Sequence, residues 1–116
     1  MTTGQEWLVD AKGCDAARLR DAGALGALFE ELIVSLGLKV VGTPQWHTFP
    51  GPGGVTGMAL LSESHLTLHT FPEHGFAALN LYTCKERPRP DFTSLVEKHL
   101  GAAQVEVREL TRGGTK

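Results

Sequence analysis

Side chains that could do chemistry gather between residues 56 and 84, in a stretch that is otherwise rich in apolar residues. The string Ser-Glu-Ser-His at positions 62–65 comes directly after the apolar run Met-Ala-Leu-Leu. His69 and Glu73 follow soon afterwards, and Cys84 ends the next apolar run. Reactive side chains at the ends of rigid strands are well placed for a site, because packing fixes their positions. These residue types suggest nucleophilic or acid–base chemistry.

Several simpler interpretations of the same residues have to be weighed. His65 and His69 would share one face if their segment were helical, but the alternating leucines indicate a strand and no third ligand is evident, so we expect no metal site. The sequence Gly-Pro-Gly-Gly at 51–54 lacks the Lys-Ser/Thr of a phosphate-binding P-loop and predicts a hairpin turn. Ser64 and His69 have no Gly-x-Ser-x-Gly elbow of a hydrolase around them. The residues alone therefore leave a catalytic role open.

The elements that would position these side chains alternate between helical and extended patterns. Apolar residues at three- and four-residue steps predict a helix over 17–36, ended by Gly37, and a second helix is expected over 91–101. Strands are expected at 6–11, 39–49, 55–61, 66–69, 76–84 and 105–110, with a frayed tail at 111–116. This order favours an α+β fold, a two-layer sandwich in which two helices cover one face of a mainly antiparallel sheet.

Length and composition limit the class of protein. At 116 residues the chain is expected to be one domain over residues 1–116. Eleven Lys and Arg against thirteen Asp and Glu include no basic block, so no nucleic-acid partner is expected. No apolar run has the length of a membrane span and residues 1–6 carry no signal-peptide pattern, which predicts a cytoplasmic protein without a membrane partner. Cys14 and Cys84 have no CxxC spacing; a disulfide is not expected, and Cys14 receives no role.

Three strings together resemble the prokaryotic S-adenosylmethionine decarboxylase proenzymes. They are Gly-Val-Thr-Gly at 54–57, Ser-Glu-Ser-His-Leu-Thr-Leu-His-Thr-Phe-Pro-Glu at 62–73, and Leu-Tyr-Thr-Cys at 81–84. Leu-Val-Asp at 8–10 and Gly-Cys-Asp at 13–15 are more loosely similar to the first strand and turn of that family. The central string is long and continuous, which makes the resemblance specific.

The resemblance implies roles for five residues. The bond between Glu63 and Ser64 would be the self-cleavage site, giving chains 1–63 and 64–116. Ser64 would attack the Glu63 carbonyl and end as a pyruvoyl group, the self-made cofactor. Thr56, where the family usually has Ser, would support the processing intermediate. His69 would assist processing, for which an imidazole with a pKa near working pH is suited. Cys84 would return a proton to the substrate carbon after decarboxylation.

A self-made carbonyl is chemically coherent here. Loss of CO₂ from an amino acid leaves a carbanion, which a ketone that forms an imine with the substrate amine can delocalise, as pyridoxal phosphate does. By the same resemblance, Phe49 would stack on the adenine of S-adenosylmethionine, although a core Phe at a strand end is the alternative. The carboxylate of Glu73 would hold the amine or sulfonium, unless it is only an exposed turn residue. Alternation along 76–84 places Asn80 on the same side as Cys84, so Asn80 would line the site. The chain departs from the family pattern at Phe71 (usually Trp), Asn80 (usually acidic) and Lys85 (usually Gly), which bears on substrate choice.

The resemblance thus predicts a carboxy-lyase that supplies the aminopropyl donor for spermidine and forms a homodimer of processed protomers. Its partner would be a small-molecule substrate. One alternative is a pyruvoyl-dependent arginine or ornithine decarboxylase of the same family. The other is a non-enzymatic α+β binding module, in which Ser-Glu-Ser-His is only the end of a strand.

Overall fold

The computed structural model describes residues 3–113. Its strands are β1 (Gly4–Lys12), β2 (Gln45–Thr48), β3 (Val55–Leu61), β4 (Ser64–Phe71), β5 (Phe76–Thr83) and β6 (Gln104–Arg112). Its helices are α1 (Ala16–Leu19), α2 (Ala22–Leu36) and α3 (Phe92–Leu100), with a 3₁₀ turn, η1 (Pro72–His74), between β4 and β5. Among these residues no helix combines the length and the apolar character needed to cross a bilayer.

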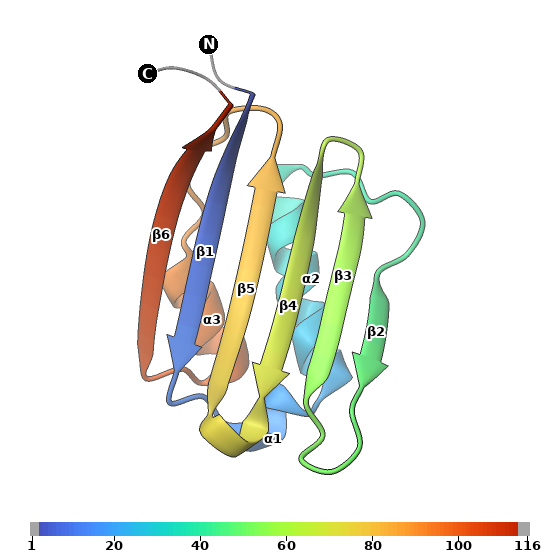
Figure 1. Ribbon diagram of the computed structural model, residues 1–116, viewed down its shortest axis with the longest axis vertical. Coiled ribbons are helices and arrows are strands. Elements are labelled where there is room, and N and C mark those ends of the chain that lie inside the picture. Colours follow the sequence, from blue (N-terminus) through green and yellow to red (C-terminus); the bar gives the residue numbers. More distant parts are fainter. Residues whose placement is uncertain (1–2, 114–116) are drawn as a thin grey trace.

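The six strands form one antiparallel sheet in the order β2-β3-β4-β5-β1-β6. Hairpins join β2 to β3, β3 to β4 and β4 to β5, whereas β1 lies between the two later strands β5 and β6. Helices α2 and α3 pack side by side on one face, behind the sheet in the view of Figure 1. The predicted two-layer α+β sandwich is confirmed.

The hydrophobic core lies between that face and the helices. Alternate residues of the strands point into it, such as Trp7 and Val9 of β1 and Leu66 and Leu68 of β4, all with at most 1% of their surface exposed. The helices supply apolar side chains at three- and four-residue steps. These buried helical residues are Leu25, Leu28, Phe29 and Leu32 of α2 and Phe92, Val96 and Leu100 of α3. Burial of each large side chain contributes ~1.5–3 kcal/mol, so the core fixes the strand register on which the site depends.

The single helix expected over 17–36 is wrong, because the chain forms two helices there. Asp15 caps α1 by accepting a hydrogen bond from the Ala17 N–H (3.0 Å), and Asp21 caps α2 by accepting one from the Gly23 N–H (2.9 Å). Asp is a preferred N-cap residue, so the second cap starts a new helix one turn after the first. The expected end of this region at Gly37 is confirmed, since Gly37 adopts the left-handed conformation (φ 63°).

Several strand boundaries also differ from expectation; β4, for example, covers Ser64–Phe71 where only 66–69 was expected. The strand expected over 39–49 is reduced to β2, because Gly42 has a positive φ of 77° and Pro44 follows it. Before Gly42, only an isolated bridge pairs Val40 with Leu61. The frayed tail expected from residue 111 is wrong for its first two residues, because Thr111 and Arg112 pair with β1 as the end of β6. Residues 114–116 of that tail lie outside the described residues.

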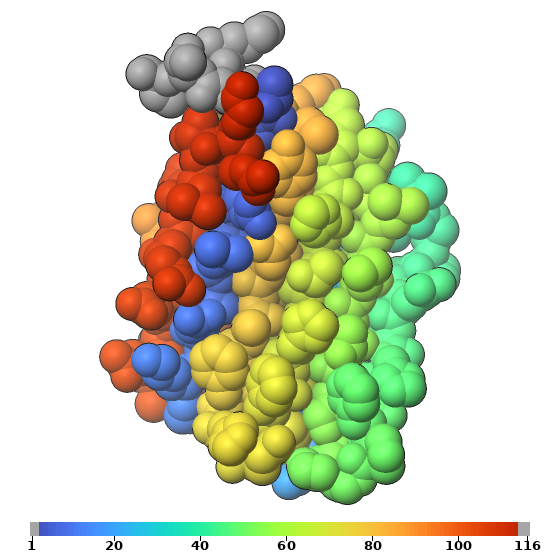
Figure 2. All heavy atoms as spheres, viewed as in Figure 1, coloured from blue at the N-terminus to red at the C-terminus, as the bar shows by residue number. Residues whose placement is uncertain are grey.

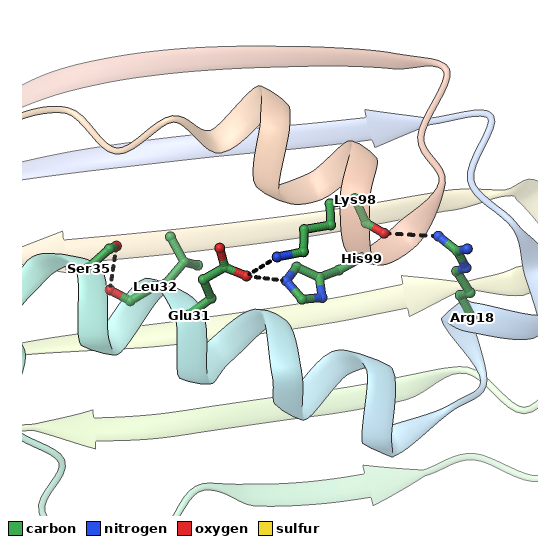
Figure 3. A network of polar contacts seen from close by, with 6 residues as sticks. All are labelled: Arg18, Glu31, Leu32, Ser35, Lys98 and His99. Atoms are coloured by element: carbon green, nitrogen blue, oxygen red, sulfur yellow. Dashed lines mark hydrogen bonds and ion pairs between the residues drawn. The ribbon is translucent and has the colours of Figure 1, made fainter.

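A polar contact ties α3 to α2 on the outer side of the helical layer (Figure 3). One carboxylate oxygen of Glu31 accepts hydrogen bonds from His99 Nε2 (2.8 Å) and Lys98 Nζ (3.0 Å). These two bonds, that of His99 first, lower the pKa of Glu31 below its usual value. Arg18 Nη1 donates to the Lys98 carbonyl (3.0 Å) and so connects α1 to the same helix end.

The opposite face of the sheet is left uncovered by the helices of residues 3–113 (Figures 1 and 2). Four large apolar side chains on this open face are 39–60% exposed: Met58, Leu60, Phe71 and Leu110. Beside them lie imidazole, carboxylate and guanidinium groups of the same strands. A face of this kind is unusual for a monomer, since large exposed apolar patches mark interaction sites.

Candidate active site

The predicted cleavage bond lies in a tight turn between β3 and β4, at the upper end of the sheet in Figure 1. Leu61 pairs with Ser64, so only Ser62 and Glu63 form the turn. The Glu63 carbonyl oxygen accepts a hydrogen bond from the backbone N–H of Cys84 at 2.9 Å. The Glu63 carboxylate pairs with Lys85 Nζ at 3.1 Å. The structure therefore brings Glu63, Ser64 and Cys84 together.

The contact between Glu63 and Cys84 results from the register of β4 against β5. Ser64 pairs with Thr83 and Leu66 with Leu81, and the buried leucines fix that register. Continuing the ladder by one residue places Cys84 opposite Glu63. Thr83 Oγ1 donates to the Lys85 carbonyl (2.9 Å) and holds the bend after β5, while the Cys84 thiol stays free and exposed.

A pocket of about 390 Å³ lies at the other end of β3 and β4. Four of the predicted site residues line it: Phe49, Thr56, His69 and Glu73. Thr56 and His69 form a cross-strand pair on the open face, and Thr56 Oγ1 is hydrogen-bonded to His69 Nδ1 at 3.1 Å. The remaining lining residues are Pro52, Gly54, Thr70 and Phe71.

Buried contacts under this pocket keep its walls in place. The Thr70 hydroxyl donates to the Leu19 carbonyl (2.8 Å) and accepts from the Val55 N–H (2.9 Å), which ties β4 to α1 and to β3. Gly54 lies so close to the backbone that a Cβ there would be 2.7 Å from the Thr70 oxygen. The Phe49 N–H donates to the Gly54 carbonyl (2.7 Å), which closes the 49–54 turn beside the pocket.

The position of the edge strand β2 depends on Trp46. Its ring packs across Gly57 of β3, where any Cβ would collide with it, and lies 4.8 Å from the ring of Phe29 in α2. This contact anchors β2 to the core, although most of its residues are exposed. Phe49 follows directly after β2, and its ring meets that of His47 edge-on at 4.9 Å.

Ser64 and His69 do not meet within the chain. Five residues separate them on an extended strand, which corresponds to roughly 17 Å at ~3.3 Å per residue. They also have opposite parity in β4: Leu66 and Leu68 face the helices on the side of Ser64, whereas His69 faces the open side. The predicted site residues thus form two groups at opposite ends of the sheet.

Asn80 lies between these two groups, on the open face of β5. Its Nδ2 donates to Glu6 (2.7 Å), and its Oδ1 accepts from His65 Nε2 (3.1 Å). Glu6 also pairs with Arg112 at 2.5 Å. The hydrogen bond from Asn80, followed by the contact with Arg112, holds the pKa of Glu6 below its ordinary value of 4.5. Asn80 is therefore part of a polar network, roughly 13 Å along the strand from Cys84.

This fold and these motifs match a known protein family. The sequence model described as S-adenosylmethionine decarboxylase matches residues 5–113, which is nearly the whole chain. The chain belongs to the S-adenosylmethionine decarboxylase family. The predicted family resemblance is confirmed.

Relatives that match over most of both chains support this family assignment. The chain is 37% identical to S-adenosylmethionine decarboxylase proenzyme 2 of Halalkalibacterium halodurans, over 97% of this chain and 87% of that protein. It is 36% identical to the proenzyme of Geobacillus kaustophilus, over 97% and 89%. The crystal structure of the adenosylmethionine decarboxylase from Aquifex aeolicus superposes with a TM-score of 0.83 at 27% identity, covering 99% of this chain and 94% of that one.

Sequence reasoning missed several side chains that the S-adenosylmethionine decarboxylase fold brings next to the predicted ones. Glu6 contacts both Asn80 and Arg112 only because β1 inserts between β5 and β6. The alternation of Glu6, Leu8 and Asp10 along β1 is the one signal that could have indicated their shared face. Arg87, which follows the predicted cysteine by three residues, gave no such signal.

Proposed function

We propose that this chain is a self-processing, pyruvoyl-dependent S-adenosylmethionine decarboxylase. The observation that carries the proposal is the contact at the predicted scissile bond, where the Cys84 N–H donates to the carbonyl of Glu63, the residue before Ser64, at 2.9 Å. Family membership supports it, as do relatives that are named proenzymes of this activity. These names favour S-adenosylmethionine over arginine or ornithine. A decarboxylated product would then serve as the aminopropyl donor for spermidine.

Cleavage begins with attack of Ser64 Oγ on the Glu63 carbonyl carbon. Negative charge develops on the Glu63 oxygen, toward which the Cys84 N–H already points, and a donor placed in advance stabilises such charge strongly. The C–N bond then breaks, the nitrogen takes up a proton, and Glu63 becomes esterified to the Ser64 oxygen. Loss of the Ser64 α-proton expels the Glu63 carboxylate, and the remaining dehydroalanine reacts with water to give the pyruvoyl group and ammonia.

We infer that His69 of another copy of the chain supplies the base for the elimination. His69 of the same protomer is roughly 17 Å from Ser64, too far for proton transfer without a relay. We infer a homodimer in which two open faces pack together about a two-fold axis across the strands. Each His69 and Thr56 would then lie near the partner's upper sheet end. The exposed Met58, Leu60 and Phe71 would be buried in this isologous interface.

The same arrangement assembles the substrate site. The pocket of Phe49, His69 and Glu73 would face the other protomer's residue 64 and Cys84. The Phe49 ring, 48% exposed, is available to stack on adenine, and the Glu73 carboxylate attracts a sulfonium. Residues at the Ser64 end fit a self-derived pyruvoyl group, which supplies an electron sink for decarboxylation. The Cys84 thiol, which is free and exposed, would hold the proton that the product carbon receives.

Complementation between two inactive variants tests the shared site. Ser64→Ala and His69→Ala are produced separately and together from two differently tagged genes. In a mixed dimer, one site combines Ser64 of the His69→Ala chain with His69 of the Ser64→Ala chain and is therefore intact. We expect cleavage of the His69→Ala chain only when both are co-produced, with release of ¹⁴CO₂ from carboxyl-labelled S-adenosylmethionine. Failure of co-production to rescue cleavage contradicts the shared site.

A further inference from the structure

Another pocket, of about 230 Å³, lies beside Glu63 at the predicted cleavage bond. It is lined by Gly37, Lys39, Ser62, Glu63, Lys85 and Arg87. These residues come from the loop after α2, from the turn between β3 and β4, and from the loop after β5. Its charged lining consists of three cationic side chains and one carboxylate.

Arg87 is the one of these three lining cations that has a buried donor without an acceptor among residues 3–113. Its Nη1 donates to the Leu36 carbonyl at 2.7 Å, and its backbone N–H donates to Gln5 Oε1 at 2.8 Å. Its Nε is buried and has no hydrogen-bond partner among residues 3–113. A buried guanidinium donor without an acceptor is costly, because it has lost its water without gaining a partner. With Lys39 and Lys85 beside it and only Glu63 opposing them, the lining of the pocket is positively charged and suits an anion.

Cleavage would create such an anion at this point of the chain. In the uncleaved chain the Glu63 main chain is a neutral amide, and only its side chain faces Lys85. When the ester is eliminated, the C–O bond to residue 64 breaks and Glu63 leaves as a carboxylate with one new negative charge. The Ser62 N–H donates to the Lys39 carbonyl at 2.9 Å, which keeps the residue before Glu63 at the edge of the pocket.

We propose that the pocket of Lys39, Lys85 and Arg87 binds the new α-carboxylate of Glu63 after self-cleavage. This inference rests on the proposed function, since it needs the bond between Glu63 and Ser64 to be cut. A carboxylate on a guanidinium is a charge-assisted, often bidentate contact, far stronger than the exposed pair of Glu63 and Lys85. Binding draws the Glu63 terminus away from the Cys84 N–H, opens the space in front of residue 64 for substrate, and opposes re-formation of the ester.

Trimming by a broad-specificity carboxypeptidase tests the proposal on the processed wild-type protein. The mass of the 1–63 fragment is followed over time, because loss of Glu63 requires its α-carboxylate to enter the protease. We compare the double variant Lys39→Gln/Lys85→Gln and the single variant Arg87→Gln, with Lys12→Gln at the far end of β1 as the matched control. Loss of the charge-assisted contacts should make trimming ~10-fold faster or more in both test variants and leave the control unchanged.

A second readout separates binding of the carboxylate from a structural role of Arg87. Arg87→Gln should lower Tm more in the processed protein than in the uncleaved Ser64→Ala background, because only the processed protein has the new charge. Equal losses of Tm, together with equal trimming rates, overturn the proposal while leaving self-cleavage intact. A wild-type protein that never divides overturns both the proposal and the proposed function.

Discussion

The hydrogen bond from the Cys84 N–H to the Glu63 carbonyl predicts that the backbone N–H of Cys84 assists self-cleavage, separately from any role of its thiol in decarboxylation. Cys84→Ala removes the thiol and keeps the N–H, whereas Cys84→Pro removes both. Thr83 is the last residue of β5 and is extended, which is the conformation that a residue before proline prefers. Any difference between the two variants in processing is then due to the missing donor.

The size of that difference follows from the geometry. A distance of 2.9 Å is near the optimum for an N–H···O bond, and its net value in the ground state is ~0.5–1.5 kcal/mol. When Ser64 attacks, the same oxygen becomes an anion and the bond roughly doubles in strength. Removal of a single oxyanion donor typically slows a reaction ~10²–10³-fold, which we expect for Cys84→Pro relative to Cys84→Ala.

The assay follows the intact mass of freshly synthesised protein as the 12.5 kDa chain divides into two fragments. Cys84→Ala should process at a rate similar to the wild type and lose decarboxylase turnover. Cys84→Pro should accumulate as the full chain, with a melting curve close to that of uncleaved Ser64→Ala to show that it has folded. A folded Cys84→Pro protein that divides as fast as Cys84→Ala would refute the assigned role of the N–H.

Three further expectations concern stability. The contacts with Asn80 and Arg112 lower the pKa of Glu6 below 4.5. The stability that the Glu6 carboxylate contributes is therefore present above pH 4.5 and is lost as the pH falls through the lowered pKa. In urea unfolding, Glu6→Gln should lose less unfolding free energy than the wild type over this acidic range. Asn80→Asp replaces the 2.7 Å hydrogen bond to Glu6 with a second carboxylate and should lower the unfolding free energy by ~1–3 kcal/mol at neutral pH. An unchanged urea midpoint would contradict this expectation. Asp91→Ala removes the N-cap of α3, whose carboxylate accepts from the Ser94 N–H (3.1 Å), and should lower the unfolding free energy by ~1 kcal/mol without slowing processing. Equal urea midpoints for the variant and the wild type would show that the cap is dispensable.

The regular parts of the fold could be predicted from the sequence because they carry their own signals. Helix α3 begins after Asp91, a capping residue, and ends at Gly101 in the left-handed conformation, as expected from those residue types. The division between α1 and α2 was missed, since the apolar period continues across Asp21 and only the cap reveals the break. The strand expected over 39–49 was too long, because the positive φ at Gly42 ends the extended conformation that the apolar pair at 40 and 41 suggested.

The chemical identities of the site could be predicted, but their arrangement could not. The strings around Ser64, His69 and Cys84 indicate the chemistry. The separation of Ser64 from His69 follows from extended geometry once their segment is a strand. The contact of Cys84 with Glu63 depends on the β4–β5 register, which buried leucines set only in the folded state. The meeting of Asn80 with Glu6 depends on the insertion of β1 beside β5, which no local pattern specifies.

The most direct test of the central claim is the intact mass of the purified protein. The account predicts two chains, residues 1–63 and 64–116, with the second resistant to Edman degradation because a pyruvoyl group replaces its amino terminus. Ser64→Ala, which lacks the attacking oxygen, should remain one chain of 12.5 kDa. A wild-type protein that stays at that single mass after long incubation would contradict the account.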